Sequence, residues 1–141
     1  NRSILADPRS DKMKDLINEK VKHRQWYRPF APSILRERVS TWFERDDDSP
    51  YMNIVLNFKE DMKEKVPAVV HMNGSARIQT VTENDNFWYY NFLKKWEEKS
   101  SVPILLNTSF NDREPICETP EVQINTVQEK NLIYLFPTNT F

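Results

Sequence analysis

Two groups of side chains in this sequence have the types and spacing to bind an anion. One is a basic segment, residues 20–32, in which four cations fall within nine residues and are interleaved with two aromatic side chains. The other is a polar run, residues 107–111, that directly follows an apolar run. Lysine and arginine donate charge-assisted hydrogen bonds to phosphate, and serine, threonine and asparagine add directional bonds. Such a set suits binding a phosphate or acyl phosphate and stabilising the charge that develops during group transfer.

The basic segment contains two prolines that influence its backbone. Pro29 and Pro32 push the residues before them towards extended conformation. Alternate side chains of an extended segment share a face, so Lys22, Arg24 and Arg28 could converge on one anion. A solvated basic loop, whose aromatic side chains pack on the core, explains the same composition. The residue pattern leaves both interpretations open.

Composition excludes several other kinds of site. The single glycine, Gly74, excludes glycine-rich phosphate loops. The single cysteine, Cys117, excludes a disulfide within the chain and a cysteine metal site, which predicts a reducing, cytoplasmic location. Neither histidine lies close in sequence to Ser109, so no nucleophile with a neighbouring base is visible. The acidic run 46–48 is expected to face water, and no metal site is predicted.

The overall charge and hydropathy also narrow the partners. A formal net charge of −1 argues against a general nucleic-acid binder. No apolar run approaches the length of a membrane span, so no membrane association is expected. The 141 residues fit one domain with its own core.

Several elements must position these side chains. Residues 102–106 are predicted to form a buried strand, with the polar run in the loop beyond it. The Asn73-Gly74 dipeptide predicts a hairpin between strands 67–72 and 75–81, with Arg77 and Gln79 on one face as the wall of a polar cleft. Apolar periodicity and capping residues predict further helices over 11–21, 33–43 and 86–99 and from 119 onward, and strands over 52–58 and 131–136.

Blocks of residues along most of the chain, to about residue 120, resemble the carbamoyltransferase C-terminal domain of the NodU/CmcH family of O-carbamoyltransferases. In order, these blocks are residues 1–9, 20–24, 28–33, 49–52, 76–81 and 102–111. The resemblance implies an α+β fold (α/β-type), a YrdC-like twisted mixed β-sheet flanked by helices. It also implies that residues 1–141 are a C-terminal domain of a longer chain, without the family's N-terminal actin/hexokinase-like domain.

The same resemblance implies a function and a set of site residues. Such a domain binds carbamoyl phosphate and ATP, the latter with Mg²⁺, and forms carbamoyl-adenylate. The N-terminal domain then passes the carbamoyl group to a hydroxyl acceptor in nodulation or secondary-metabolite biosynthesis. Carried over by motif, the carbamoyl phosphate ligands are Lys22, Arg28 and Arg77, the nucleotide ligands are Arg24, Ser109 and Asn111, and Asn107 and Thr108 shape the loop. The alternative is a YrdC-like nucleic-acid-binding or docking module without catalysis.

Overall fold

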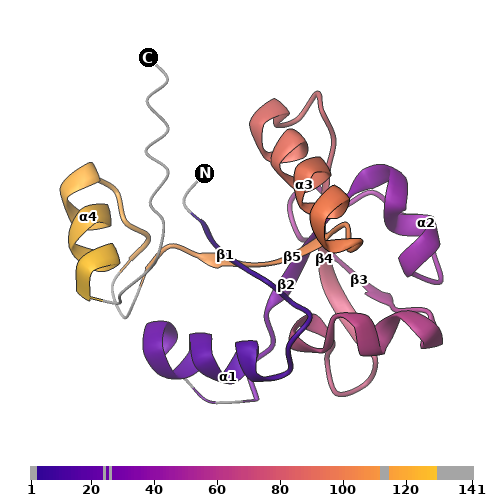
Figure 1. Cartoon of the computed structure of the whole chain (residues 1–141), viewed down its shortest axis with the longest axis horizontal. Helices are drawn as coiled ribbons and strands as arrows, with labels where there is room; N and C mark the ends of the chain where they lie inside the picture. Colours follow the sequence, from indigo (N-terminus) through magenta and orange to yellow (C-terminus); the bar gives the residue numbers. More distant parts are fainter. Residues whose placement is uncertain (1–2, 24, 26, 112–114, 130–141) are drawn as a thin grey trace.

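A mixed β-sheet forms the centre of the computed structural model, which describes residues 3–23, 25, 27–111 and 115–129 (Figure 1). The sheet has five strands in the order β1-β5-β2-β4-β3. Strands β2 and β4 are parallel, and the other neighbouring pairs are antiparallel. The strands are β1 (Ser3–Ala6), β2 (Ala31–Leu35), β3 (Ile54–Asn57), β4 (Ser75–Val81) and β5 (Ile104–Ser109).

Helices flank this sheet, which confirms the expected α+β class. Helix α3 lies on one side of the sheet and α1 on the other (Figure 1). Within the described ranges, no helix is long and apolar enough to cross a membrane. The α-helices are α1 (Lys12–Ile17), α2 (Val39–Trp42), α3 (Phe87–Ser100) and α4 (Pro120–Glu129); a π-helical turn (Asn18–Lys22) continues α1, and short 3₁₀ turns cover Arg36–Arg38, Glu60–Lys65 and Pro67–Val69.

Local sequence signals predicted many of these elements correctly. Asp11 caps α1, and the Asn86 side chain caps α3 by accepting a hydrogen bond of 3.0 Å from the Tyr89 amide. The Thr119 hydroxyl accepts from the Val122 amide at the start of α4. Strands β3, β4 and β5 fall within or overlap the predicted ranges. The predicted last strand, 131–136, lies outside the described residues.

Two predicted elements are wrong. Residues 31–35 form strand β2 rather than the start of a helix, and only the short stretch after it is helical. Every residue of β2 is buried because it is paired on both sides, with β4 and with β5. Residues 67–72 are not a strand: they begin with a 3₁₀ turn, and β4 pairs with β2 and β3 instead of forming a hairpin.

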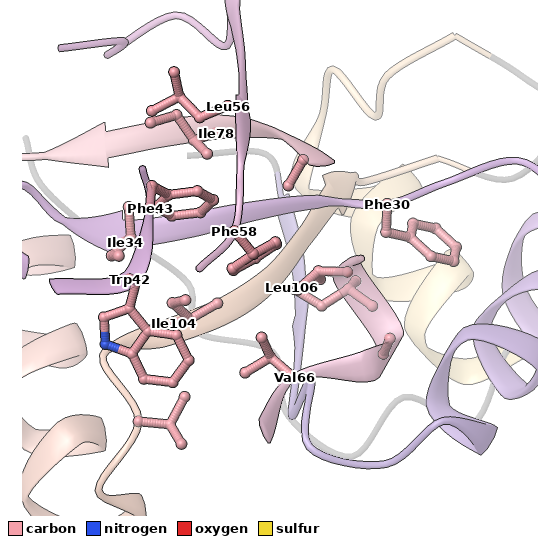
Figure 2. Packing of buried hydrophobic residues seen from close by; sticks show 14 of the residues in the cluster. Phe30, Ile34, Trp42, Phe43, Leu56, Phe58, Val66, Ile78, Ile104 and Leu106 are labelled. Carbon is pink, nitrogen blue, oxygen red and sulfur yellow. The ribbon is translucent and has the colours of Figure 1, made fainter. Parts of the chain in front are cut away.

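The larger part of the core lies on the α1 side of the sheet (Figure 2). Phe43 and Phe58 pack there with ring centroids 4.3 Å apart. A second cluster lies beneath α3, where Tyr89 and Leu93 cover apolar residues of the sheet. The sheet residues of that second cluster are Leu5, Leu35, Val81 and Leu105.

The face of the sheet that carries α3 changes character along the strands. Leu105 of β5 lies opposite Ser33 of β2, and Asn107 lies opposite Ala31. Ser33 in turn lies opposite Gln79 of β4. Side chains of paired residues share a face, so this face passes from the apolar cluster under α3 to a polar region formed by three adjacent strands.

Candidate functional site

The polar region of this sheet face lines an open cleft of about 360 Å³. Strands β1, β2, β4 and β5 all contribute to it, together with the segment that leads into β2. The cleft therefore combines residues from distant parts of the chain. Its lining residues are Ser3, Pro29, Phe30, Ala31, Met52, Arg77, Gln79, Asn107, Thr108, Ser109 and Ile116.

A hydrogen-bonded network forms the floor of the cleft. The Ser33 hydroxyl donates to Gln79 Oε1 at 2.7 Å. Asn107 Nδ2 donates both to Ser33 Oγ, at 2.9 Å, and to Gln79 Oε1, at 2.8 Å. Gln79 Nε2 donates to the Pro50 carbonyl oxygen at 3.3 Å. Ser33 and Asn107 are buried, so these side chains are held in one arrangement.

Tyr89 of α3 lies next to this network. Its hydroxyl is buried and has no hydrogen-bond partner within the described ranges. Burial raises the pKa of Tyr89, and the nearby side chains of Ser33 and Asn107 oppose that rise. The phenol is therefore neutral and adds a polar atom to the inner side of the network.

Arg77 supplies positive charge on the cleft wall. Its side chain is exposed, and no carboxylate of the described residues pairs with it. Desolvation, and then the positive charges of Arg77 and Lys14, hold the pKa of His71 below its usual value. Because Arg77 is exposed and has no carboxylate partner among the described residues, its guanidinium is available to an anion, which it can bind through two parallel hydrogen bonds.

Lys22 lies at the end of β5, where its ammonium group is surrounded by oxygen atoms. Nζ donates to the Ser109 carbonyl and hydroxyl oxygens at 2.5 and 3.1 Å, and to the Asn111 carbonyl and Oδ1 at 3.0 and 2.8 Å. Ser109 Oγ also donates to Asn111 Oδ1 at 2.6 Å. The structure therefore groups Lys22 with the two predicted nucleotide ligands rather than with Arg77.

Of the two interpretations of the basic segment, convergence of an extended run on one anion does not hold for Lys22. Lys22 ends a π-helical turn, and His23 follows in left-handed conformation with φ of 46°. Lys22 is therefore not part of an extended run with Arg28, which is exposed and does not line the cleft, although its neighbour Pro29 does. Arg24 lies outside the described residues.

Two residues expected in a loop are strand residues. Asn107 and Thr108 belong to β5, where they pair with β1, and Asn107 pairs also with β2. The expected loop-shaping role is therefore replaced by a place in the sheet, because β5 continues through the polar residues. The sequence pattern did not indicate Ser33 as a site residue, because it favours a helix start there. The signal that could have indicated a strand is the buried run on both sides of Ser33, which follows Pro29 and contains Pro32.

A second groove, of about 290 Å³, lies beside the first and shares Pro29 with it. His71 lines it and has Nδ1 3.2 Å from Ser75 Oγ. The Ser75 hydroxyl donates its proton to Asn73 Oδ1 at 2.7 Å. His71 Nδ1 must therefore be the protonated ring nitrogen in this contact, since Ser75 Oγ can only accept from it.

Carboxylates of the acidic run, residues 46–48, form ion pairs with arginines. Asp46 lies 2.6 Å from Arg36, and Asp47 lies 2.5 Å from Arg45. Among the residues that the structure describes, no group of three or more His, Cys, Asp or Glu side chains is placed to hold a metal ion.

Comparison with known proteins gives the family of this chain. The family described as "Carbamoyltransferase C-terminus" matches residues 1–141. Nodulation protein NolNO of Sinorhizobium fredii is 45% identical over 130 residues, which are 89% of this chain and 19% of that protein. Nodulation protein NolO of Bradyrhizobium diazoefficiens is also 45% identical over 130 residues, or 24% of its length. An uncharacterized protein of Methanocaldococcus jannaschii is 42% identical over 137 residues, or 22% of its length.

These relatives are much longer than the matched region. The chain spans about a fifth to a quarter of the length of NolNO, NolO and the archaeal protein. The match to the family nevertheless runs over the whole of this chain. The chain therefore belongs to the carbamoyltransferase C-terminus family.

Proposed function

We propose that this domain binds carbamoyl phosphate in the cleft beside Arg77, as part of an ATP-dependent carbamoyl transfer. The observation that carries the proposal is the exposed Arg77, which has no carboxylate partner among the described residues and lines the same cleft as the fixed polar network. A phosphate dianion suits such a group because two of its oxygens can accept the parallel N–H bonds of one guanidinium. Membership in the carbamoyltransferase C-terminus family supports carbamoyl phosphate over other phosphates.

The second substrate in this proposal is ATP with Mg²⁺, bound at the neighbouring end of β5. Ser109 and Asn111 offer hydroxyl and amide groups there, and the buried Lys22 ammonium lies within hydrogen-bond distance of both. Arg24 and Arg28 of the basic segment are proposed to add positive charge, Arg24 towards the nucleotide and Arg28 towards carbamoyl phosphate. Water cleaves carbamoyl phosphate to carbamate and phosphate, and carbamate attacks the α-phosphate of ATP to give carbamoyl-adenylate and pyrophosphate. The rest of a longer protein then transfers the carbamoyl group to a hydroxyl acceptor, with AMP as the leaving group.

Calorimetric titration with carbamoyl phosphate tests the role of Arg77. Arg77→Ala should weaken binding roughly 10- to 100-fold, since a hydrogen bond to a charged group contributes about 1.5–3 kcal/mol. Arg45→Ala removes another exposed arginine, one that pairs with Asp47 and does not line the cleft, and should bind like wild type. The proposal fails if Arg77→Ala binds as tightly as wild type, or if wild type binds neither carbamoyl phosphate nor ATP.

A further inference from the structure

The amide groups on the cleft floor have a direction that a main-chain carbonyl sets. The Pro50 carbonyl can only accept, so Gln79 must turn its Nε2 towards it. Gln79 Oε1 then faces Asn107 and also only accepts, so Asn107 must present Nδ2. The orientation of both amides therefore follows from the hydrogen-bond network, without a choice between their oxygen and nitrogen atoms.

Counting donors and acceptors shows which atoms remain for a ligand. Both N–H groups of Asn107 are used, one on Ser33 Oγ and one on Gln79 Oε1. Asn107 Oδ1 has no hydrogen-bond partner among the described residues, and this oxygen is not fully buried. Gln79 Nε2 has a second N–H besides the one on Pro50. The floor thus carries one unpaired acceptor, on Asn107, and one uncommitted donor, on its neighbour Gln79.

The spacing between Arg77 and Gln79 along β4 suits a small ligand. Arg77 and Gln79 are two residues apart on β4 and share a face, so their Cα atoms are about 7 Å apart. Both line the same cleft as Asn107. A ligand with an anionic end on Arg77 would place its other end over the two amides.

We propose that Asn107 and Gln79 recognise the carbamoyl group of the substrate, with Asn107 Oδ1 accepting from its NH₂ and Gln79 Nε2 donating to its carbonyl oxygen. This rests on the proposed function, which places the phosphate on Arg77. Asn107 then determines specificity for an amide, because the carbonyl oxygen that Gln79 binds is present in other acyl phosphates as well. Acetyl phosphate has nearly the same shape, but its methyl group cannot donate to Asn107 Oδ1 and would leave that acceptor unpaired, which costs binding free energy.

The network makes this discrimination rigid. Ser33 is 0% exposed and Asn107 is 6% exposed, so neither side chain can reorient freely. Rotating the Asn107 amide to suit a different ligand would set its Oδ1 against Gln79 Oε1, two acceptors without a proton between them. The site therefore favours a ligand that donates at this position.

Calorimetry with freshly prepared carbamoyl phosphate and with acetyl phosphate tests the assignment. Wild type should bind carbamoyl phosphate at least about tenfold more tightly than acetyl phosphate. Asn107→Leu should bind the two with similar affinity, because it loses affinity for carbamoyl phosphate alone. The bond from Ser33 to Gln79 remains in this variant, so its floor keeps a paired hydroxyl. Asn91→Leu makes the same substitution on α3, outside the cleft lining, and should keep the wild-type preference.

Other outcomes separate this inference from the proposed function. Equal binding of both acyl phosphates by wild type, with loss of both in Arg77→Ala, would overturn carbamoyl recognition and leave the anion site standing. Parallel weakening of both ligands in Asn107→Leu would also overturn it, since a merely structural role predicts that pattern. If circular dichroism shows Asn107→Leu unfolded, the smaller Asn107→Ser, which keeps a hydroxyl donor on the floor but loses Oδ1, must show the same collapse of preference. Wild type that binds neither ligand would overturn the proposed function as well.

Discussion

Replacing Lys22 by methionine tests how the end of β5 is held. Methionine keeps an unbranched side chain of similar length but removes the ammonium group. Lys22 is 7% exposed, and its Nζ lies within 3.1 Å of four oxygen atoms of Ser109 and Asn111. The substitution therefore removes the donors of this cluster while changing little of the packing around the aliphatic stem.

The expected loss follows from opposing contributions. An ammonium group has three N–H donors, so at most three of the four oxygens can be bonded at once. Each bond to a charged group contributes about 1.5–3 kcal/mol, while burying the ammonium costs several kcal/mol. The side chains of Ser109 and Asn111 are exposed or half-buried and can bind water instead. We expect a net loss of about 2 kcal/mol in the free energy of unfolding, or roughly 8 °C in Tm for a domain of this size.

Urea denaturation followed by circular dichroism measures the free energy, and amide hydrogen exchange locates the change. Exchange should accelerate at the Asn111 amide, which donates to the Ser109 carbonyl at 3.1 Å. Lys20→Met removes an exposed lysine from the same π-helical turn and should change stability by less than about 0.5 kcal/mol. If Lys22→Met is as stable as Lys20→Met and exchange near Asn111 is unchanged, the cluster does not hold the end of β5.

Three further predictions concern stability. Desolvation and the positive charges of Arg77 and Lys14 lower the pKa of His71 in the folded protein. As the pH falls below about 6.5, the unfolded chain therefore takes up a proton before the folded protein does, and stability is lost. His71→Asn should show a shallower fall in the free energy of unfolding between pH 7 and 5, and a slope equal to that of wild type would contradict this. Leu93 of α3 is 0% exposed in the cluster between this helix and the sheet, so Leu93→Ala should lower the free energy of unfolding by about 2–5 kcal/mol in urea denaturation. A cost below about 1 kcal/mol would be inconsistent with its burial. Gly74 has a φ of 80°, so Gly74→Ala should lower the free energy of unfolding by about 1 kcal/mol or more. Gly74→Asn should lower the free energy of unfolding by less, because asparagine tolerates this conformation better than alanine. Equal losses in the two variants would argue against backbone strain.

Elements with strong local signals could be predicted from the sequence. Helix α3 has an asparagine cap and a regular apolar stripe, and both act within a few residues of each other. The alternation along β4 also predicted that Arg77 and Gln79 share a face and form a polar cleft wall, and both line the cleft. These features depend on backbone periodicity, which neighbouring residues express directly.

Strand β2 shows where local reasoning is insufficient. Ser33 before an apolar run satisfies the rules for a helix cap, and the buried residues that follow suit a helix as well as a strand. Pairing with β4 and β5, which lie far along the chain, decides for the strand. A sequence pattern cannot indicate this, because the stabilising hydrogen bonds come from partners that the local window does not contain.

The candidate site also has features that the local sequence indicates and features that only strand pairing decides. Residue types and their alternation predicted a polar cleft wall with Arg77 and a polar end for the apolar run at Ser109 and Asn111, whereas an anion-binding role for Arg77 came from the family resemblance. The contact of Lys22 with Ser109 joins residues 87 positions apart, and the bond of Asn107 to Ser33 joins residues 74 apart. Such pairs depend on strand order and register, which place specific side chains on one face of the sheet. The chemistry available could therefore be read from the sequence, whereas the partners of each polar group follow from how the strands pair.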